Sequence, residues 1–420
     1  MSTPQHHAIV CDGLTDCRAA DTVRAMKHAL ILPDGAADEP LDELNGQTPL
    51  QAAHTPNMDW IAANGRIGTA RTVPDGFLPA SDVATLSVVG YNPAEYYTGR
   101  APIEAAAQNL PVGPRDIVFR CNLTTILNDV MVDFSAGHIS QPEANKLIAD
   151  LNSALADDRI RFHPGVMYRH LMILKEATGF EVQCMPPHDI PNQPIAQHMP
   201  RGRDADLVCK LMSRSREVLE HHEVNNKRRE AGKLPATSIW LWGQGGLPVL
   251  PSFESRFGLR GACVAAVDLI RGIAVLLGWP VLAVEGATGY LDTNYEGKGQ
   301  RAVEALDEFD LVCVHIEAPD EAGHNGDAAA KVQAIEQIDE HIVGPVLDKL
   351  RGFDEWKCLL MPDHPTPVAR RTHTATPPPF CMAGSSIAPD KSADFCEISA
   401  ENSNLHFAIG HDLMDYFLSA

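Results

Sequence analysis

The segment APDEAGH, residues 318–324, decides the fold when it is taken together with MPDH at 361–364 and THT at 372–374. The first segment follows the apolar run LVCVHI at 311–316, and the second ends the apolar run CLLM at 358–361. Short apolar runs of this kind are typical of buried strands. In an open α/β sheet, ligands bind just beyond the carboxyl ends of the strands. We therefore expect the three segments to form loop-like breaks around one crevice.

The side chains that would converge there are two carboxylates and three imidazoles, namely Asp320, His324, Asp363, His364 and His373. This mixture of oxygen and nitrogen ligands can hold one or two divalent metals. Each residue alone is better explained as a helix cap or a surface side chain. Their occurrence in three segments that all follow strand-like runs favours a metal site.

Composition limits the classes of protein to consider. The chain has 420 residues, of which 45% are hydrophobic, so two domains with sizeable cores are expected. The formal net charge of −21 argues against nucleic acid and anionic membrane surfaces as partners. An anionic substrate would therefore need local positive charge from metals, clustered arginines or a helix N-terminus.

The cysteine pattern and the hydropathy indicate a cytoplasmic protein. The ten cysteines include no CxxC pair, which favours reduced, buried thiols over a disulfide framework. The N-terminus lacks a basic-then-apolar signal, and no apolar run approaches the ~20 residues of a membrane span. The sequence does not define the oligomeric state, and a homo-oligomer is compatible with it.

Strand-like runs alternate with helical segments, which predicts an α/β fold with a mostly parallel sheet covered by helices on both faces. Residues 1–25 lack hydrophobic periodicity and are expected to be an extension outside the fold. The catalytic core would comprise 26–111 and 236–420, with strands that include 281–284. A smaller α+β domain, 112–235, would be inserted between them and contain one polar helix at roughly 204–230.

Three residues outside the opening segments each allow two interpretations. Asp34 stands at the carboxyl end of the first strand, where a ligand would lie, but Asp-Gly is also a common turn. Ser81 lies where a loop meets a helix, so it is either an N-cap or a nucleophile whose phosphoserine the helix N-terminus would stabilise. Arg100 either binds phosphate through its guanidinium fork or is a solvated arginine.

Six short motifs, in this order, resemble one known family. They are ILPDG at 31–35, SDV at 81–83, YTGR at 97–100, PD…GH at 319–324, DH at 363–364 and HT at 373–374. The chain resembles the cofactor-independent phosphoglycerate mutases of the archaeal type, within the alkaline phosphatase superfamily. The resemblance runs from about residue 26 to the C-terminus and implies an alkaline-phosphatase-like core.

The resemblance implies two divalent metals and no 2,3-bisphosphoglycerate cofactor. Asp320, His324 and His373 would hold one metal. Asp34, Asp363, His364 and the oxygen of Ser81 would hold the other, with Ser81 as the nucleophile. The mixed ligand set suits Mn²⁺ or Zn²⁺ better than Mg²⁺, which remains an alternative.

The implied reaction is the interconversion of 3-phosphoglycerate and 2-phosphoglycerate through a phosphoserine, a step of glycolysis and gluconeogenesis. The inserted domain would act as a lid. A homoserine kinase-like transfer to another small alcohol, or a phosphatase, would use the same core. Neither a dinucleotide fingerprint nor a P-loop occurs in the sequence. In loose alignment, the substrate-binding candidates are Arg100, His138, Arg169, His170, His188, Asp189 and Arg271.

Overall fold

The central strands of a seven-stranded sheet are buried on both faces, and successive side chains of a strand point to opposite faces. On β1 (Lys27–Pro33), Ala29 and Ile31 pack into the core on one face, and Leu30 and Leu32 pack into the core on the other. The computed structural model describes residues 26–390 and 394–420. The expected extension at 1–25 lies outside the described residues.

The sheet has the order β12-β2-β11-β10-β1-β9-β8. The neighbouring strands β10, β1, β9 and β8 are parallel, whereas β11 runs antiparallel to both of its neighbours. The expected class, a mostly parallel α/β sheet, is confirmed. The strands besides β1 are β2 (Arg66–Ala70), β8 (Gly261–Val264), β9 (Leu311–Ile316), β10 (Trp356–Leu360), β11 (Pro379–Gly384) and β12 (His406–Phe407).

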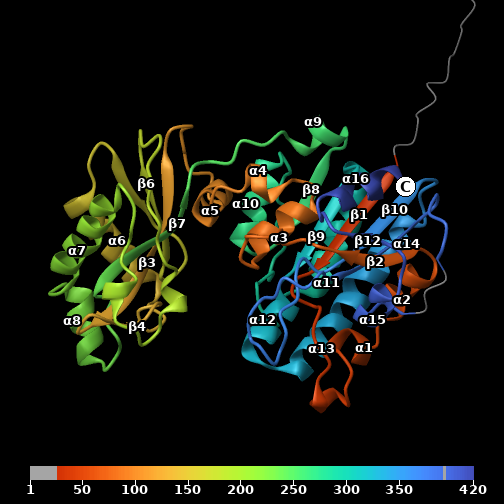
Figure 1. Cartoon of the computed structure of the whole chain (residues 1–420), viewed down its shortest axis with the longest axis horizontal. Helices are drawn as coiled ribbons and strands as arrows, with labels where there is room; N and C mark the ends of the chain where they lie inside the picture. Colours follow the sequence, from red (N-terminus) through yellow and green to blue (C-terminus); the bar gives the residue numbers. More distant parts are fainter. Residues whose placement is uncertain (1–25, 391–393) are drawn as a thin grey trace, which may run out of the picture.

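Helices cover both faces of this sheet and form the large lobe on the right of Figure 1. One face carries α1 (Pro49–Ala52), α2 (Pro56–Ala63), α11 (Tyr295–Glu308), α13 (Ala328–Ile338), α14 (Gly344–Leu350) and α15 (Glu397–Glu401). The other carries α3 (Ser81–Val88), α9 (Phe253–Phe257), α10 (Asp268–Leu276) and α16 (Asp412–Ser419). The remaining helices of this lobe are α4 (Pro93–Tyr96), α5 (Arg100–Ala107) and α12 (Ala318–Asn325). A π-helical turn, Asp339–Val343, joins α13 to α14.

The small lobe, on the left of Figure 1, contains an antiparallel sheet with a separate core. Its strand β3 pairs with β4, β6 and β7, and β5 pairs with β6. The strands are β3 (Ile117–Leu127), β4 (Val130–Asp133), β5 (Ile160–His163), β6 (Arg169–Leu174) and β7 (Ser238–Gly245). The helices are α6 (Gln141–Leu155), α7 (Ala205–Leu219) and α8 (Glu223–Glu230).

The structure corrects the expected boundary of the inserted domain. The segment at 238–246 was assigned to the catalytic core, but β7 pairs with β3 along 118–124 and belongs to the small sheet. An isolated apolar run does not reveal which sheet it joins, because pairing partners are distant in sequence. The small lobe therefore extends to residue 245.

Three local expectations were also wrong. The single helix expected at 204–230 is two helices, because α7 ends at Leu219 and the side chain of His222 caps α8 by accepting from Val224 N. The expected strand at 281–284 makes only one bridge, between Cys263 and Val281, at the edge of the sheet. The segment at 318–324 is not a loop-like break but the helix α12.

None of the described helices is long and apolar enough to cross a membrane. The eight cysteines among the described residues are free thiols.

Candidate active site

Three adjacent parallel strands, β10, β1 and β9, end at the same edge of the large sheet. Asp34 directly follows β1, and its backbone N–H donates to the carbonyl of Ile316 at the end of β9. Asp363 follows β10, and Asp320 follows β9 on α12. The sheet topology therefore brings together three carboxylates that are far apart in the sequence, as expected for an open α/β sheet.

The first predicted ligand set converges on one point. Asp320 and His324 are four residues apart on α12 and so share one face of the helix. His324 Nε2 lies 3.3 Å from Asp320 Oδ2, and His373 Nε2 lies 3.5 Å from Asp320 Oδ1. The two Nε2 atoms are 2.9 Å apart. The Nδ1 atom of His324 faces the backbone carbonyl of Arg371, and that of His373 faces the carbonyl of Pro79. These contacts direct both Nε2 atoms toward Asp320.

The second predicted set surrounds His364. Its Nε2 atom lies 3.4 Å from Asp363 Oδ2, 3.8 Å from Asp34 Oδ1 and 3.1 Å from the hydroxyl oxygen of Ser81. Ligand atoms of Asp34, Asp320 and His364 lie within 4.8 Å of one another, so the two sets are adjacent. Ser81 is the first residue of α3 and is nearly buried; the N-cap position belongs to Ala80, so the capping interpretation was wrong.

Two orphaned atoms indicate that this cluster suits a cation. Asp34 Oδ1 and Asp363 Oδ2 are buried and have no hydrogen-bond partner among the described residues. Leaving a carboxylate oxygen unpaired in the interior is costly unless a cation compensates it. The mixture of carboxylates and imidazoles is the donor set of divalent ions such as Mn²⁺ and Zn²⁺.

The pKa shifts of the carboxyl groups reflect their burial and the repulsion between their negative charges. Burial and the neighbouring Asp363 raise the pKa of Asp34 well above its usual range. Burial and Asp320 raise the pKa of Glu317 to about 8. Burial also opposes ionisation of Asp320, but hydrogen bonds with His324 and His373 hold its pKa well below the usual range. Divalent cations would relieve this repulsion and keep all of these carboxylates ionised.

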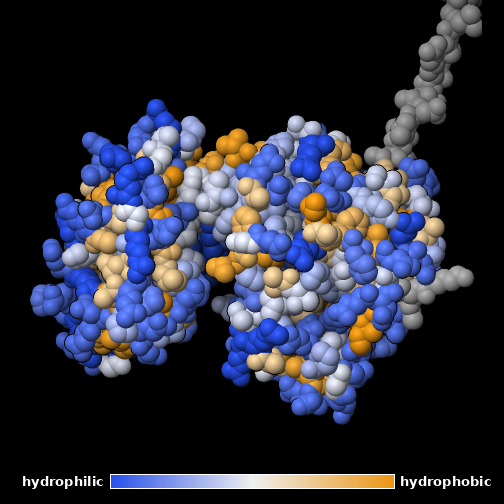
Figure 2. Space-filling model, in the orientation of Figure 1, coloured by the Kyte–Doolittle hydropathy of each residue, from blue (hydrophilic) through white to orange (hydrophobic). Residues whose placement is uncertain are grey.

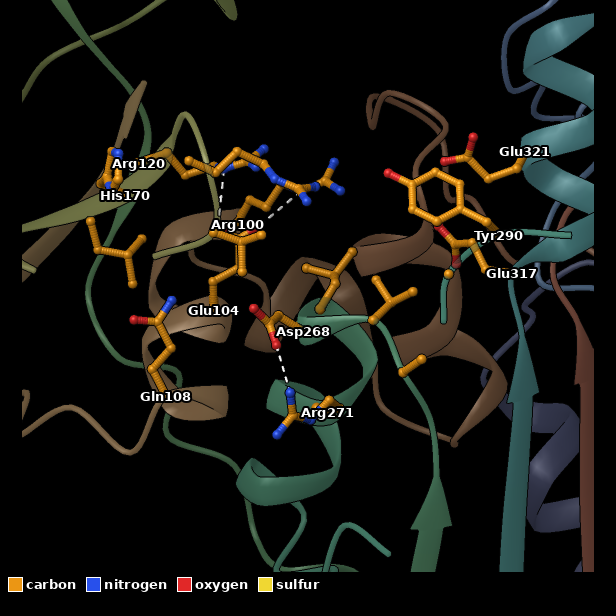
Figure 3. A pocket seen from close by; sticks show the side chains of 17 residues that line it. Arg100, Glu104, Gln108, Arg120, His170, Asp268, Arg271, Tyr290, Glu317 and Glu321 are labelled. Atoms are coloured by element: carbon orange, nitrogen blue, oxygen red, sulfur yellow. Dashed lines mark hydrogen bonds and ion pairs between the residues drawn. The ribbon is translucent and has the colours of Figure 1, made fainter. Parts of the chain in front are cut away.

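A pocket of about 290 Å³ lies between the two lobes, beside this cluster (Figure 3). Four arginines line it: Arg100 at the start of α5, Arg120 on β3, Arg169 on β6 and Arg271 on α10. Figure 3 shows Tyr290 and Glu321 across the pocket from Arg100 and Arg120. Carboxylates line the pocket as well, because Glu104 pairs with Arg100 and Arg120, and Glu317 and Glu321 form part of the wall. The guanidinium groups are the part of this lining that matches an anionic substrate.

Not all of the predicted substrate-binding residues lie in this pocket. Arg100, Arg169, His170 and Arg271 line it, although Arg271 is paired with Asp268 at 2.9 Å. The other three candidates, His138, His188 and Asp189, do not line it. His138 and Asp189 are exposed. His188 lies edge-on to Trp242 with ring centroids 5.0 Å apart.

The sequence analysis missed Arg120, which is buried at 6% exposure. Its guanidinium lies 3.1 Å from Glu104 Oε2 and 4.4 Å from the ring centroid of Trp242. Burial lowers the pKa of Arg120 to about 10. An arginine within an otherwise apolar strand is itself unusual, because arginine is rarely buried without a partner or a function. The run IVFRCNL at 117–123 therefore indicates a paired or functional arginine.

Glu317 and His315 were also missed as neighbours of Asp34. His315 Nε2 lies 2.7 Å from Asp34 Oδ2 and 3.6 Å from Glu317 Oε2. His315 is the one polar residue of the apolar run at 311–316, and Glu317 directly follows it. A polar residue in that place within a buried strand indicates a role at the carboxyl end of the sheet.

Comparisons with known proteins agree with this fold. Residues 62–225 match the family model described as 2,3-bisphosphoglycerate-independent phosphoglycerate mutase. A protein of that name from Methanothrix thermoacetophila is 49% identical over 390 residues, which cover 93% of this chain and 98% of the relative. One from Methanosarcina acetivorans is 49% identical over 391 residues, again 93% and 98% of the two chains.

Two solved structures are similar over nearly their full length. A protein from Pyrococcus horikoshii is 30% identical, with a TM-score of 0.80 over 94% of this chain and 97% of that one. A cofactor-independent phosphoglycerate mutase from Thermoplasma acidophilum is 26% identical, with a TM-score of 0.65 over 94% and 99% of the two chains.

A mostly parallel sheet whose strand ends gather Asp and His side chains defines an α/β protein with a candidate metal centre. Within that class, the chain belongs to the family of 2,3-bisphosphoglycerate-independent phosphoglycerate mutases.

Proposed function

We propose that this chain interconverts 3-phosphoglycerate and 2-phosphoglycerate, with Ser81 as the nucleophile and two divalent cations at the clustered carboxylates and imidazoles. The observation that carries the proposal is the position of the Ser81 hydroxyl, 3.1 Å from His364 Nε2 in a ligand set that adjoins the other. The names of the relatives favour this reaction over the homoserine kinase-like and phosphatase alternatives.

The residues that would hold the cations are those of the two sets described above. Asp320, His324 and His373 would hold one, and Asp34, Asp363, His364 and Ser81 the other. Such ions lower the pKa of a coordinated hydroxyl and neutralise charge on a phosphoryl group in transfer. The donor set favours Mn²⁺ or Zn²⁺.

The protein's own residues would then perform two transfers. Ser81 Oγ bonds to phosphorus as the bond from phosphorus to the 3-oxygen of glycerate breaks. The resulting phosphoserine lies at the N-terminus of α3, where the helix dipole favours negative charge. Glycerate then presents its 2-oxygen, which takes the phosphoryl group and regenerates Ser81.

The arginines of the pocket would hold glycerate between the two transfers. Arg100, Arg120 and Arg169 come from both lobes, so closure of the small lobe over the site would bring their guanidinium groups around the carboxylate of glycerate. Figure 2 shows the hollow that separates the lobes. Holding the acceptor in place gives it an effective concentration above that of competing water.

Replacing Ser81 by alanine tests the proposal. We expect Ser81→Ala to fold and to bind cations, because six of the seven ligand residues remain, but to retain less than a few per cent of mutase activity. Mass spectrometry after acid quenching should find phosphate on Ser81 in the wild type only. Ser87→Ala, on the same helix, serves as the control and should stay active. Substantial turnover by Ser81→Ala would refute the assignment.

A further inference from the structure

The hydroxyl of Thr366 contacts one member of each ligand set. Thr366 lies in the loop that follows β10, and its side chain is fully buried. Its Oγ1 atom is 2.5 Å from Asp320 Oδ1 and 3.3 Å from His364 Nδ1. Asp320 belongs to the first set and His364 to the second. A single hydroxyl therefore links one ligand of each proposed cation site.

The direction of these hydrogen bonds follows from the groups involved. An ionised carboxylate only accepts, so the single proton of the Thr366 hydroxyl is donated to Asp320. The hydroxyl oxygen must then accept from His364, and Nδ1 of that ring must carry the proton. This arrangement leaves the lone pair of His364 Nε2 free and directed at Ser81 Oγ, 3.1 Å away. A neutral imidazole with a free Nε2 is the form that binds a cation.

The loop does not need this hydroxyl to keep its conformation. The backbone N–H of Thr366 donates to the carbonyl of Gly35 at 3.3 Å, and its carbonyl accepts from Lys331 Nζ at 2.9 Å. The neighbouring carbonyl of Pro365 accepts from the backbone N–H of Thr374 at 3.0 Å. Because these bonds involve the main chain of the loop, a substitution at Thr366 removes the hydroxyl while leaving them in place.

We propose that Thr366 is a positioning residue that orients Asp320 and His364 together and so sets the cation affinity of both sites. The proposal rests on the two-cation function above. A positioning role predicts that loss of the Thr366 hydroxyl weakens cation binding, whereas a purely structural role predicts that it destabilises the fold. Loss of a hydrogen-bond partner behind a metal ligand typically weakens metal affinity about 10- to 100-fold.

The test compares Thr366→Val, which keeps the shape, with Thr366→Ser, which keeps the hydroxyl. Metal-free full-length protein is titrated with Mn²⁺, and free Mn²⁺ is followed by electron paramagnetic resonance. The absorption spectrum of the Co²⁺-substituted protein reports ligand geometry independently of activity. We expect Thr366→Val to weaken both sites about 10- to 100-fold and Thr366→Ser to stay within about threefold of the wild type. The midpoint of thermal unfolding of the metal-free protein should be similar in all three.

Several outcomes would overturn this role. Wild-type Mn²⁺ affinity at both sites in Thr366→Val would do so, as would weakening of one site alone or an equal loss in Thr366→Ser. If Thr366→Val does not fold, Thr366→Ala removes the same hydroxyl without placing a methyl group against Asp320, and the same criteria apply. A wild-type protein that binds no Mn²⁺ would instead refute the two-cation proposal, and the role of Thr366 with it.

Discussion

Arg120 is a buried cation whose orientation is fixed by neighbouring side chains. Its guanidinium lies 3.1 Å from Glu104 Oε2 and 4.4 Å from the Trp242 ring, so its orientation is restricted before any ligand binds. Arginine suits this position because its planar fork matches a carboxylate or phosphate in two parallel hydrogen bonds. A preorganised cation loses little conformational entropy on binding.

We expect Arg120→Ala to raise the KM for 3-phosphoglycerate by about 10- to 100-fold, the effect of losing a charge-assisted pair of hydrogen bonds. Arg120→Lys should recover only part of the loss, because an ammonium cannot reproduce the fork. Steady-state kinetics measure both variants. Arg214→Ala on α7, an exposed arginine of the same lobe, is the control. An unchanged KM in Arg120→Ala would remove Arg120 from the substrate pocket.

At the scale of elements, helix α13 is attached to the catalytic loops by a fully buried lysine. Lys331 Nζ donates to Asp38 Oδ2 at 2.7 Å and to the carbonyls of Ala37 and Thr366 at 3.2 and 2.9 Å. Asp38 lies just beyond β1, and Thr366 lies beyond β10. The Lys331 ammonium therefore connects the loop after β1 with the loop after β10, and each loop carries candidate cation ligands.

We expect Lys331→Met to lower the free energy of unfolding by about 3–5 kcal/mol, because it leaves the carboxylate of Asp38 buried and unpaired. The double variant Lys331→Met/Asp38→Asn should recover part of this loss. Urea unfolding followed by circular dichroism measures the effect. The surface pair Lys349–Asp307 provides the control, since Lys349→Met should cost less than about 1 kcal/mol. Equal losses in the two single variants would contradict this account.

Strand β1 also contains a buried histidine outside the active site. His28 is 3% exposed, and burial lowers its pKa to about 4. The unfolded chain, with a pKa near 6.5, takes up a proton as the pH falls through that value, whereas the folded chain does not until the pH approaches 4. Protonation therefore favours the unfolded state between about pH 6.5 and 4.

Between pH 7 and pH 5, we expect this difference to lower the free energy of unfolding of the wild type by about 2 kcal/mol more than that of His28→Phe. Phenylalanine keeps the ring that packs edge-on to Phe417, and the carbonyl of Asp310 keeps its bond from the backbone of residue 28. Urea titrations of both proteins at the two pH values provide the comparison. Parallel losses would mean that His28 does not titrate as described.

For the whole molecule, the arrangement of the two lobes bears on the fate of the proposed phosphoserine. The pocket takes residues from both lobes, and Arg169 at its small-lobe side is exposed, with its guanidinium 5.6 Å from the Tyr168 ring centroid. Arg169 is therefore free to hold glycerate when the lobes close. Without that hold, water would compete for the phosphoserine, and the enzyme would act as a phosphatase.

We expect Arg169→Ala to reduce mutase turnover and to raise the ratio of inorganic phosphate to 2-phosphoglycerate formed from 3-phosphoglycerate. Arg161→Ala, an exposed arginine on the neighbouring strand β5, should leave the ratio unchanged. The two products are quantified in the same reaction. If Arg169→Ala keeps the wild-type ratio, another group retains the intermediate, and the exposed His188 is the next residue to test.

The sequence by itself determined the α/β class and the position of the candidate ligands at strand ends. Buried parallel strands are read from local apolar runs, and polar residues directly after such runs lie at one edge of the sheet. Asp34, Asp320 and Asp363 could therefore be assigned to a common edge from local patterns. The order of six short motifs was sufficient to indicate the family.

Only the tertiary structure decided which elements pair and which side chains meet across them. Strand β7 joins the small sheet by pairing with β3, which lies more than a hundred residues earlier in the chain. No local sequence pattern encodes a pairing over that distance. The pocket depends on Arg120 meeting Glu104 and Trp242, and the link between the ligand sets depends on Thr366 lying between Asp320 and His364. Such contacts join residues that are distant in the chain, so they are set by packing and topology rather than by local periodicity.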